Sequence, residues 1–579
     1  MHTSKMRERR PVVASEDVGS WHDRVDVVVV GSGASALVAG VMAAAGGARV
    51  IALEKAAETG GTTRKSGGNA WVPDDHRTRA LGLADSRDGA LHYMARTSRP
   101  ELYWPEAPSL GLPDWEYEGI CLFLDEGARA FAGLAEMGAL DTIPLPDIPN
   151  FYSAVDRVVH GRTLAPRAPN GDPADGPELV RQLSEALEQR GGRIELEHRV
   201  VSVVVDGERV VGVLADTPHG SRAIHAARAV IFGSGGFTHN VDLRRSFIRG
   251  PVFGGCAARS NEGDFVSIAQ ALGADMRNMS ESWNAPIQLE RALAGDPTLT
   301  GTFSVVGNSV LCVNRYGRRA MNEKSVYNEA TAPMLQFDGI RCEYPNMLMF
   351  AVFDQANYDA FRGTPFDGGA LPAVGEDDRH VIRGATLEQL AERIDERLAE
   401  LAGAIGGLRL AADFSSRLAA TVDRFNGFAL QGRDDDFRRG DTEIERYLYR
   451  LVSNAIQLGT DSQLGGGASN QAASFGPGKA GWMEPEANGN STMAPLAEKG
   501  PFYSVILAAG MLDTKGGPRT DTHGRVLDGN GAPITGLYAV GNCAASPSGK
   551  AYWGGGATLG PMITYAWRAG RHAAAPDRR

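Results

Sequence analysis

The hydrophobic positions of this chain follow several patterns, and each predicts a different element. Residues 27–30 are four consecutive valines, a run typical of a strand buried on both faces of a parallel sheet. Residues 198–216 hold two more β-branched runs around Asp206-Gly207, a turn dipeptide that predicts a hairpin. Residues 415–430 space their apolar positions as a helix does. Thr386 and Gln389 form a capping-box pattern that predicts a helix through Leu401.

The first valine run leads into a glycine-rich turn. The pattern G-x-G-x-x-G/A is supplied by Gly31, Gly33, Ala34, Ser35 and Ala36. A second predicted strand, residues 49–53, ends in Glu54. Strand, turn, helix, strand and acid in this order predict a dinucleotide site, in which the helix N-terminus meets a pyrophosphate and the carboxylate meets a ribose hydroxyl. An ordinary turn without a ligand is the alternative.

A second polar and glycine-rich stretch follows about thirty residues later. Its candidate cofactor contacts are Lys55, Gly61, Thr62, Thr63, Ser66, Gly67 and Gly68. A nicotinamide domain does not need this second stretch. It suits a longer ligand that continues beyond its pyrophosphate. The sequence therefore favours FAD over NAD.

Charge and composition exclude several other classes. The net charge is −11, which argues against nucleic acid, since nucleic acid favours clustered Lys and Arg. Five scattered cysteines form no CxxC pair, so no metal site is expected, and their odd number fits a cytoplasmic protein. Residues 27–48 carry no charge, but glycines interrupt them near both ends. We interpret them as strand, turn and helix, and expect no membrane span.

Taken together, the motifs resemble the FAD-dependent 3-ketosteroid Δ1-dehydrogenases of the fumarate reductase superfamily. The matching segments are DVVVVGSGASAL, GGTTRKSGG, AVIFGSGGF, TKGGPRTD and GLYAVGN. The resemblance implies an α/β fold with a Rossmann-type FAD-binding domain built from both chain ends and an inserted α+β substrate domain. It adds Val201, Gly235, Gly541, Asn542, Thr558 and Leu559 as cofactor contacts. TTRKSGGN contains no histidine, so noncovalent FAD is expected.

The domain limits follow from where the cofactor motifs stop. We expect a flexible tail over residues 1–22, an FAD-binding domain over 23–285 and 501–579, and a substrate domain over 286–500. Residues 465–478 are predicted to be a mobile loop because they are rich in glycine. The substrate is expected in the crevice between the domains.

The resemblance also implies the chemistry. In fumarate reductases an arginine lies in the carboxy-terminal glycine motif, and here Tyr552 takes its place. A phenol does not neutralise a dicarboxylate, but it donates a hydrogen bond to a ketone. The resemblance therefore implies that Tyr552 and the Gly556 N–H hold a ketone oxygen, that Tyr327 removes the neighbouring proton, and that a hydride passes to FAD.

Two positions depart from the resemblance. The supporting tyrosine of the family falls on Phe151 or Tyr152; only Tyr152 has a hydroxyl, so it is the candidate. Trp553 replaces a smaller residue and is expected to reshape the pocket. The expected partners are an apolar ketone and an external electron acceptor. A fumarate- or enoate-type reductase, a dehydrogenase of a smaller ketone and a non-enzymatic FAD protein are the alternatives.

Overall fold

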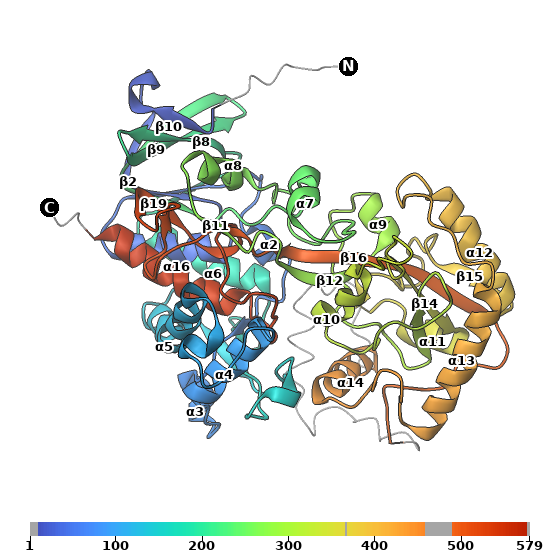
Figure 1. The fold of residues 1–579 in the computed structure, drawn as a ribbon. Helices are drawn as coiled ribbons and strands as arrows, with labels where there is room; N and C mark the ends of the chain where they lie inside the picture. The colour runs from blue at the N-terminus through green and yellow to red at the C-terminus, as the bar shows by residue number, and fades with distance from the viewer. Residues whose placement is uncertain (1–9, 365–366, 458–488, 576–579) are drawn as a thin grey trace.

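The protein has two lobes, each built around its own sheet (Figure 1). The structure is a computed structural model that describes residues 10–364, 367–457 and 489–575. The predicted mobile loop at 465–478 lies outside the described residues. The first and the last described elements, β1 (Val12–Ala14) and α16 (Leu559–Ala574), both belong to the lobe that holds the larger sheet (Figure 1).

The larger sheet has nine strands, and its main path runs β1-β8-β9-β10-β2-β3-β7, with β19 beside β10 and β18 beside β19. Its strands are β1 (Val12–Ala14), β2 (Asp23–Val30), β3 (Val50–Leu53), β7 (Arg193–Glu195), β8 (Arg199–Asp206), β9 (Arg209–Thr217), β10 (Gly220–Phe232), β18 (Arg525–Leu527) and β19 (Pro533–Ala539). β2 is parallel to both β3 and β10, and β10 is parallel to β19. Strands from both chain ends therefore share one sheet.

The four consecutive valines of β2, Val27 to Val30, are buried alternately on the two faces of this sheet. Val27 and Val29 pack with helices α1 (Ala34–Ala45), α6 (Gly176–Gln189) and α16 (Leu559–Ala574). Val28 and Val30 pack on the other face with α8 (Asp264–Ala271). The predicted strand buried on both faces is confirmed, and so is the hairpin, because β8 and β9 are antiparallel neighbours.

The same lobe carries further elements outside the large sheet. They are α2 (Gly61–Arg64), β4 (Ala70–Trp71), α3 (His76–Ala80), α4 (Arg87–Ser98), α5 (Asp114–Glu136), β5 (Thr142–Leu145), β6 (Thr163–Pro166), α7 (Val241–Phe247), β11 (Met276–Arg277) and β17 (Gly517–Pro518). Strands β4, β6 and β5 form a small sheet of their own.

The second lobe is built around a five-stranded sheet. Its strands are β12 (Ser282–Gln288), β13 (Val310–Val313), β14 (Leu348–Asp354), β15 (Ile382–Gly384) and β16 (Phe502–Thr514), and its helices are α9 (Leu289–Leu293), α10 (Tyr327–Thr331), α11 (Gln355–Phe361), α12 (Leu387–Glu400), α13 (Phe414–Gln431) and α14 (Glu443–Gln457). The predicted helices near 387 and 415 are α12 and α13. Thr386 caps α12 by accepting a hydrogen bond from the Gln389 N–H.

Two of the expected limits differ from the structure. Residues 12–14 are not a flexible tail, since β1 pairs in parallel with β8. Residues 502–514 do not stay with the large sheet either. They form β16, which pairs with β12, β14 and β15 and reaches from the centre of the molecule into the second lobe (Figure 1). The hydrophobic run of β16 did not show which sheet it would join.

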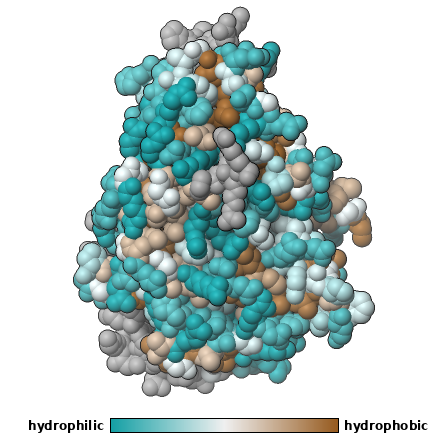
Figure 2. Space-filling view, turned by 90° about the vertical axis from the view of Figure 1, so that its left-hand side faces the viewer, coloured by the Kyte–Doolittle hydropathy of each residue, from teal (hydrophilic) through white to brown (hydrophobic). Residues whose placement is uncertain are grey.

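Figure 2 shows a face on which hydrophilic residues dominate and hydrophobic residues gather in small groups. Among the described residues, no helix is both long and apolar enough to cross a membrane.

Candidate active site

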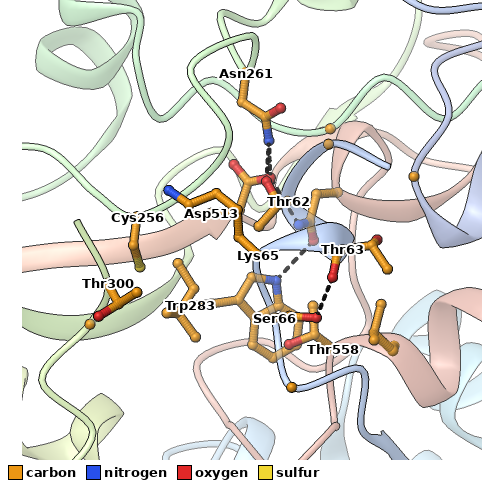
Figure 3. Close-up of a pocket in the computed structure, with 18 of the residues that line it drawn as sticks. Thr62, Thr63, Lys65, Ser66, Cys256, Asn261, Trp283, Thr300, Asp513 and Thr558 are labelled. Atoms are coloured by element: carbon orange, nitrogen blue, oxygen red, sulfur yellow. Dashed lines mark hydrogen bonds between the residues drawn. The ribbon is translucent and has the colours of Figure 1, made fainter. Parts of the chain in front are cut away.

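A cavity of about 800 Å³ joins the glycine-rich turns to a group of aromatic side chains. That volume lies within the usual range for ligand pockets, about 300–1,000 Å³. Figure 3 shows part of its wall, in which Thr62 lies beside Asn261 and Asp513. Residues from both lobes line this one cavity.

The glycine-rich end is shaped by main chain that leaves no room for side chains. Gly31 has a φ of 103°, and a Cβ atom there would lie 2.6 Å from the Gly233 carbonyl oxygen. Gly33 is the N-cap of α1 and makes no side-chain cap. The first turn of this twelve-residue helix therefore faces the cavity, which is the geometry that binds phosphate. Ala36 lies outside the cavity and packs against Gly233, which keeps helix and strand close.

Glu54 connects the two glycine-rich stretches. Its carboxylate is buried and accepts hydrogen bonds from the Ser32 hydroxyl at 2.6 Å and from the Ala56 N–H at 2.9 Å. The Ser32 hydroxyl in turn accepts a hydrogen bond from the Gly60 N–H at 2.9 Å. Glu54 lines the cavity, so its carboxylate oxygens can accept further hydrogen bonds from a ribose bound there.

The second stretch contributes hydroxyl groups. Thr63 accepts a hydrogen bond from the Ala34 N–H at 3.0 Å, and Ser66 donates to the Thr63 carbonyl at 2.7 Å (Figure 3). Thr62 accepts from the Asn261 amide at 3.2 Å. These bonds fix α2 against the N-terminus of α1, so two segments that are separate in sequence form one wall.

Asp513 was missed by the sequence analysis. This buried carboxylate lines the cavity and accepts hydrogen bonds from the Asn261 amide at 2.7 Å, the Asn542 amide at 2.9 Å and the Gly236 N–H at 3.0 Å. Burial raises the pKa of Asp513. Its neighbours come from residues 236–542, so no local motif pointed to it.

The aromatic end brings the two proposed catalytic tyrosines together. The rings of Tyr327 and Tyr552 meet edge to face, with centroids 5.1 Å apart and planes at 79°. Phe151 stacks on Tyr552 at 5.3 Å, and Trp283 meets it edge-on at 5.1 Å. Phe303 lies against Tyr327 at 5.0 Å. The two hydroxyls thus share one apolar compartment that adjoins the glycine-rich end.

The environment of both phenols keeps them neutral. Burial, followed by the neighbouring Tyr552 hydroxyl, raises the pKa of Tyr327 well above its ordinary value. Burial also raises the pKa of Tyr552, while hydrogen bonds to Thr558 and Tyr327 oppose that rise. The Thr558 hydroxyl donates to the Tyr552 hydroxyl at 3.1 Å. A neutral Tyr552 suits a hydrogen-bond donor, whereas Tyr327 is a weak base at neutral pH.

Gly556 lies close to the main chain of a neighbouring segment. Its φ is 92°, and a Cβ atom there would come within 2.5 Å of the Asn69 carbonyl carbon. No described residue accepts a hydrogen bond from the Gly556 N–H. It lines the cavity together with Tyr552, so it can donate to the same ligand.

The motifs that precede Tyr327 have a structural role. Arg319 pairs with Glu323 at 2.7 Å and with Asp434 at 2.8 Å, and Arg439 pairs with Glu323 at 3.3 Å. All four side chains are buried, so each charge needs these partners. The segments 314–327 and 421–440 therefore meet in one network, which anchors the chain immediately before α10 and Tyr327.

The residues fit an FAD molecule. The cavity offers a helix N-terminus for a pyrophosphate, a carboxylate for a ribose and, at Asn69, a buried amide oxygen that has no hydrogen-bond partner among the described residues. Within the same described ranges, no three His, Cys, Asp or Glu side chains gather as metal ligands.

Comparison with known proteins identifies the family. A model of the FAD binding domain matches residues 26–559. The chain belongs to the FAD binding domain family. It is 32% identical to 4-oxocyclohexanecarboxylate 2-dehydrogenase of Sinomonas cyclohexanicum, over 96% of this chain and 93% of that protein. It is 30% identical to 3-oxosteroid 1-dehydrogenase of Mycobacterium tuberculosis, over 95% of this chain and 98% of that protein.

A solved structure supports the fold. The 3-ketosteroid Δ1-dehydrogenase of Sterolibacterium denitrificans, in complex with 1,4-androstadiene-3,17-dione, has a TM-score of 0.77 and 24% identity, and the match covers 95% of this chain and 99% of that one. The α/β fold class, the FAD cofactor and the FAD-dependent oxidoreductase class are thereby confirmed.

Most of the residues predicted for this family site line the cavity. They are Gly31, Gly33, Ala34, Ser35, Glu54, Lys55, Gly61, Thr62, Thr63, Ser66, Gly67, Gly68, Gly235, Tyr327, Gly541, Asn542, Tyr552, Gly556, Thr558 and Leu559. Ala36, Val201 and Tyr152 are not part of the lining. On β8 the lining residue is Val200, because successive residues of a strand point to opposite faces.

The aromatic position beside Tyr327 is filled by Phe151, which corrects the preference for Tyr152. The Phe151 ring meets Tyr327 edge-on at 5.5 Å and lines the cavity. The Tyr152 hydroxyl instead donates to the Glu329 carboxylate at 2.7 Å. A pair of adjacent aromatic residues gave no means to decide which ring would face the ligand.

Trp553 does not reshape the cavity, contrary to expectation. Its side chain is fully buried and packs against Trp71, with centroids 5.8 Å apart, and Phe123, at 6.4 Å. It is absent from the cavity lining. Its carbonyl oxygen accepts a hydrogen bond from the Phe151 N–H at 3.2 Å, so the main chain of Trp553 is joined to that of Phe151.

Proposed function

We propose that this protein dehydrogenates an uncharged cyclic ketone and introduces a C=C bond next to the carbonyl. The observation that carries the proposal is the contact of Tyr327 with Tyr552, rings 5.1 Å apart, in the cavity that Gly556 and the FAD contacts also line. Both relatives named above are dehydrogenases of cyclic ketones by their names. The sequence identity and the tyrosine pair support the same chemistry.

Each residue has a part in this reaction. The Tyr552 hydroxyl and the Gly556 N–H hold the ketone oxygen and stabilise the enolate that forms on it. This polarisation acidifies the α-carbon, and Tyr327 in its deprotonated, phenolate form accepts the α-proton and becomes a neutral phenol. The bound cofactor would supply the acceptor for the hydride that leaves the β-carbon. The ketone loses one proton and one hydride, and an external electron acceptor reoxidises the cofactor.

The first turn of α1 and the Glu54 carboxylate would hold the pyrophosphate and the ribose of FAD. The N-terminus of α16, at Thr558 and Leu559, lines the cavity and would offer its dipole to the flavin. The cofactor is proposed to be noncovalent.

The cations of the cavity favour an uncharged substrate. Among the described residues, Lys55, Lys65 and Arg291 are the lysines and arginines of the lining. Lys55 pairs with Glu262 and Asp264, and Arg291 pairs with Asp296. Lys65 donates to the carbonyls of Pro297 and Leu299. Because Arg291 is paired with Asp296, a fumarate-like dicarboxylate would lack a free guanidinium partner among the described lining residues.

The remaining wall around the tyrosines is apolar. Ile444 and Leu448 of α14, together with Leu512 and Phe303, line this part of the cavity. The proposed substrate is therefore a ketone with an apolar body, of the 3-oxosteroid or the cyclohexanone kind.

The test is anaerobic mixing of the FAD-loaded protein with a 3-oxosteroid, cyclohexanone and 4-oxocyclohexanecarboxylate. The flavin absorbance near 450 nm should bleach with an uncharged ketone, and the product should be the α,β-enone. Bleaching only with the carboxylate would overturn the uncharged substrate. Fumarate reduction by the chemically reduced protein, without ketone oxidation, would overturn the dehydrogenase.

A further inference from the structure

Tyr152 links the segments that carry the two proposed catalytic tyrosines. The Tyr552 N–H donates to the Tyr152 hydroxyl at 3.1 Å, and that hydroxyl donates to the Glu329 carboxylate at 2.7 Å. Glu329 stands two residues after Tyr327 in α10. One phenol therefore joins the main chain of Tyr552 to the helix of Tyr327.

Asn328 forms a second connection between the same segments. Its amide donates to the Glu329 carboxylate at 2.9 Å and to the Lys550 carbonyl at 3.3 Å. Its oxygen accepts a hydrogen bond from the Asn284 N–H at 3.1 Å. Asn328 thus holds the carboxylate in place and also reaches the loop that leads into Tyr552.

The Tyr152 hydroxyl must be protonated to make both of its bonds, because it accepts one hydrogen bond and donates the other. Burial, with the nearby Glu329 carboxylate, raises the pKa of Tyr152 well above its ordinary value. Tyr152 therefore stays neutral over the working pH range. It does not line the cavity, so it has no direct contact with a ligand there.

The local structure gives a reason for such a link. α10 has five residues, too few to be stable by itself, since isolated helices shorter than about 12 residues are marginal. The Tyr552 loop is a glycine-rich segment without regular structure before α16. Ring contacts and the buried ion-pair network hold each tyrosine from other sides, and the bonds between the two segments add a direct link that sets their spacing.

We propose that Tyr152, Asn328 and Glu329 form a brace that sets the position of Tyr552 relative to Tyr327. These three are positioning residues, and the inference rests on the proposed function of the two tyrosines. Proton abstraction and ketone binding occur on neighbouring atoms of one substrate, and a misplacement of about 1 Å costs about 100-fold in rate. The brace thus acts on the rate of the chemical step more than on ketone affinity.

The experiment compares Tyr152→Phe, Glu329→Ala and Glu329→Gln in the full-length, FAD-loaded protein. Tyr316→Phe and Glu343→Ala are matched controls, because the Tyr316 hydroxyl donates to the Glu343 carboxylate outside the cavity. The rate of flavin reduction at saturating ketone and the ketone Kd are measured by anaerobic stopped flow. FAD content and Tm are recorded for each variant.

Tyr152→Phe and Glu329→Ala should each slow flavin reduction by about 10- to 100-fold with little change in ketone Kd. The double variant should be no slower than Tyr152→Phe, because the two residues act through one bond. Glu329→Gln, which keeps an acceptor oxygen, should recover most of the rate, and both controls should stay close to wild type. A Tyr152→Phe rate within twofold of wild type would overturn the brace. A double variant whose rate loss equals the product of the two single losses would also overturn it.

Failure of the proposed function gives a different result. If no ketone reduces the wild-type flavin, the dehydrogenase assignment fails, and crystal structures then decide on the brace. FAD-loaded Tyr152→Phe should show the Tyr327 and Tyr552 rings displaced from their 5.1 Å edge-to-face contact. An unchanged pair in that crystal would overturn the brace without any activity measurement.

Discussion

The two ends of the cavity are built in opposite ways. At the glycine-rich end, positions such as Gly31 and Gly68 bring main chain close to other main chain, so the absence of a side chain defines the shape. At the aromatic end, Tyr327, Tyr552 and Phe151 define the shape by ring contacts, and two hydroxyls carry the chemistry. FAD binding should therefore depend on glycines that have no side chain, and ketone chemistry on the rings and hydroxyl groups of the aromatic residues.

The largest expected effect separates these two ends. Tyr552→Phe removes the hydroxyl that holds the ketone oxygen but keeps the ring that packs on Phe151 and Trp283. Loss of one oxyanion donor costs about 100- to 1,000-fold, or about 2.7–4 kcal/mol. We expect flavin reduction by ketone to slow by that factor while FAD content is unchanged. Stopped-flow absorbance measures the rate.

Tyr503→Phe is the matched control, since its hydroxyl bonds to Gln355 in the second lobe. It should reduce flavin at the wild-type rate. A Tyr552→Phe rate within tenfold of wild type would contradict the role of Tyr552 as donor and would place the ketone elsewhere.

Gly31→Ala tests the other end. A Cβ atom would lie 2.6 Å from the Gly233 carbonyl oxygen, at a φ of 103°. The strained backbone alone costs about 1–3 kcal/mol, and the clash adds to it beside the expected pyrophosphate. We expect lower Tm and loss of most FAD, read from the ratio of absorbance at 450 and 280 nm.

Gly47→Ala is the control that distinguishes backbone strain at a positive φ from steric overlap of the added Cβ atom. Its φ is 82°, but nothing lies within 4 Å of the added Cβ atom. This variant should lose some stability and keep its FAD. Equal FAD loss in both variants would show that strain anywhere in the lobe, and not the shape of the turn, releases the cofactor.

The difference between the glycine-rich end and the aromatic end also explains which site residues the sequence could predict. The glycine-rich end follows from local order: a valine run, glycines at fixed spacing, a helix and an acid, all within residues 27–54. Gly31 and Gly33 were found because their roles depend on main-chain shape, which nearby residues determine. The resemblance to a known family then supplied Tyr327 and Tyr552.

The remaining residues around the aromatic end could not be predicted from local sequence patterns. Phe151 and Tyr152 are adjacent and both aromatic. The Phe151 ring lines the cavity against Tyr327, while the Tyr152 hydroxyl bonds to Glu329, which is remote in sequence. Asp513 lies in a hydrophobic strand, where its partners Asn261 and Asn542 are remote in sequence. Such positions depend on contacts between the two lobes, and a local sequence pattern does not predict these contacts.

The pH dependence sharpens the role of Tyr327. A general base acts when deprotonated, and burial raises the pKa of Tyr327 well above its ordinary value, so little phenolate exists at neutral pH. The rate of flavin reduction should therefore rise about tenfold per pH unit toward alkaline pH, without a plateau near neutrality. A rate independent of pH between 6 and 9 would contradict Tyr327 as the unaided base.

A smaller effect is expected from Phe151→Tyr. The added hydroxyl would enter the ring contact with Tyr327, where centroids are 5.5 Å apart. A hydrogen bond donated to the Tyr327 oxygen favours the phenolate and lowers its pKa. Flavin reduction near pH 8 should become a few-fold faster, with the pH profile displaced to lower pH. Phe303→Tyr, on the other neighbour of Tyr327, is the comparison. A slower variant with an unmoved profile would show that the new hydroxyl only crowds the pocket.

The smallest effect on ketone choice is expected from Trp553→Phe, although this residue adjoins Tyr552 in sequence. Its indole is fully buried against Trp71 and Phe123 and does not line the cavity. The smaller ring leaves a void in the core, which should cost about 1–3 kcal/mol of stability and is measured by chemical denaturation. The ratio of rates with a 3-oxosteroid and with cyclohexanone should stay within twofold of wild type. A ratio changed more than fivefold would mean that the packing of Trp553, and not only the cavity wall, selects the ketone.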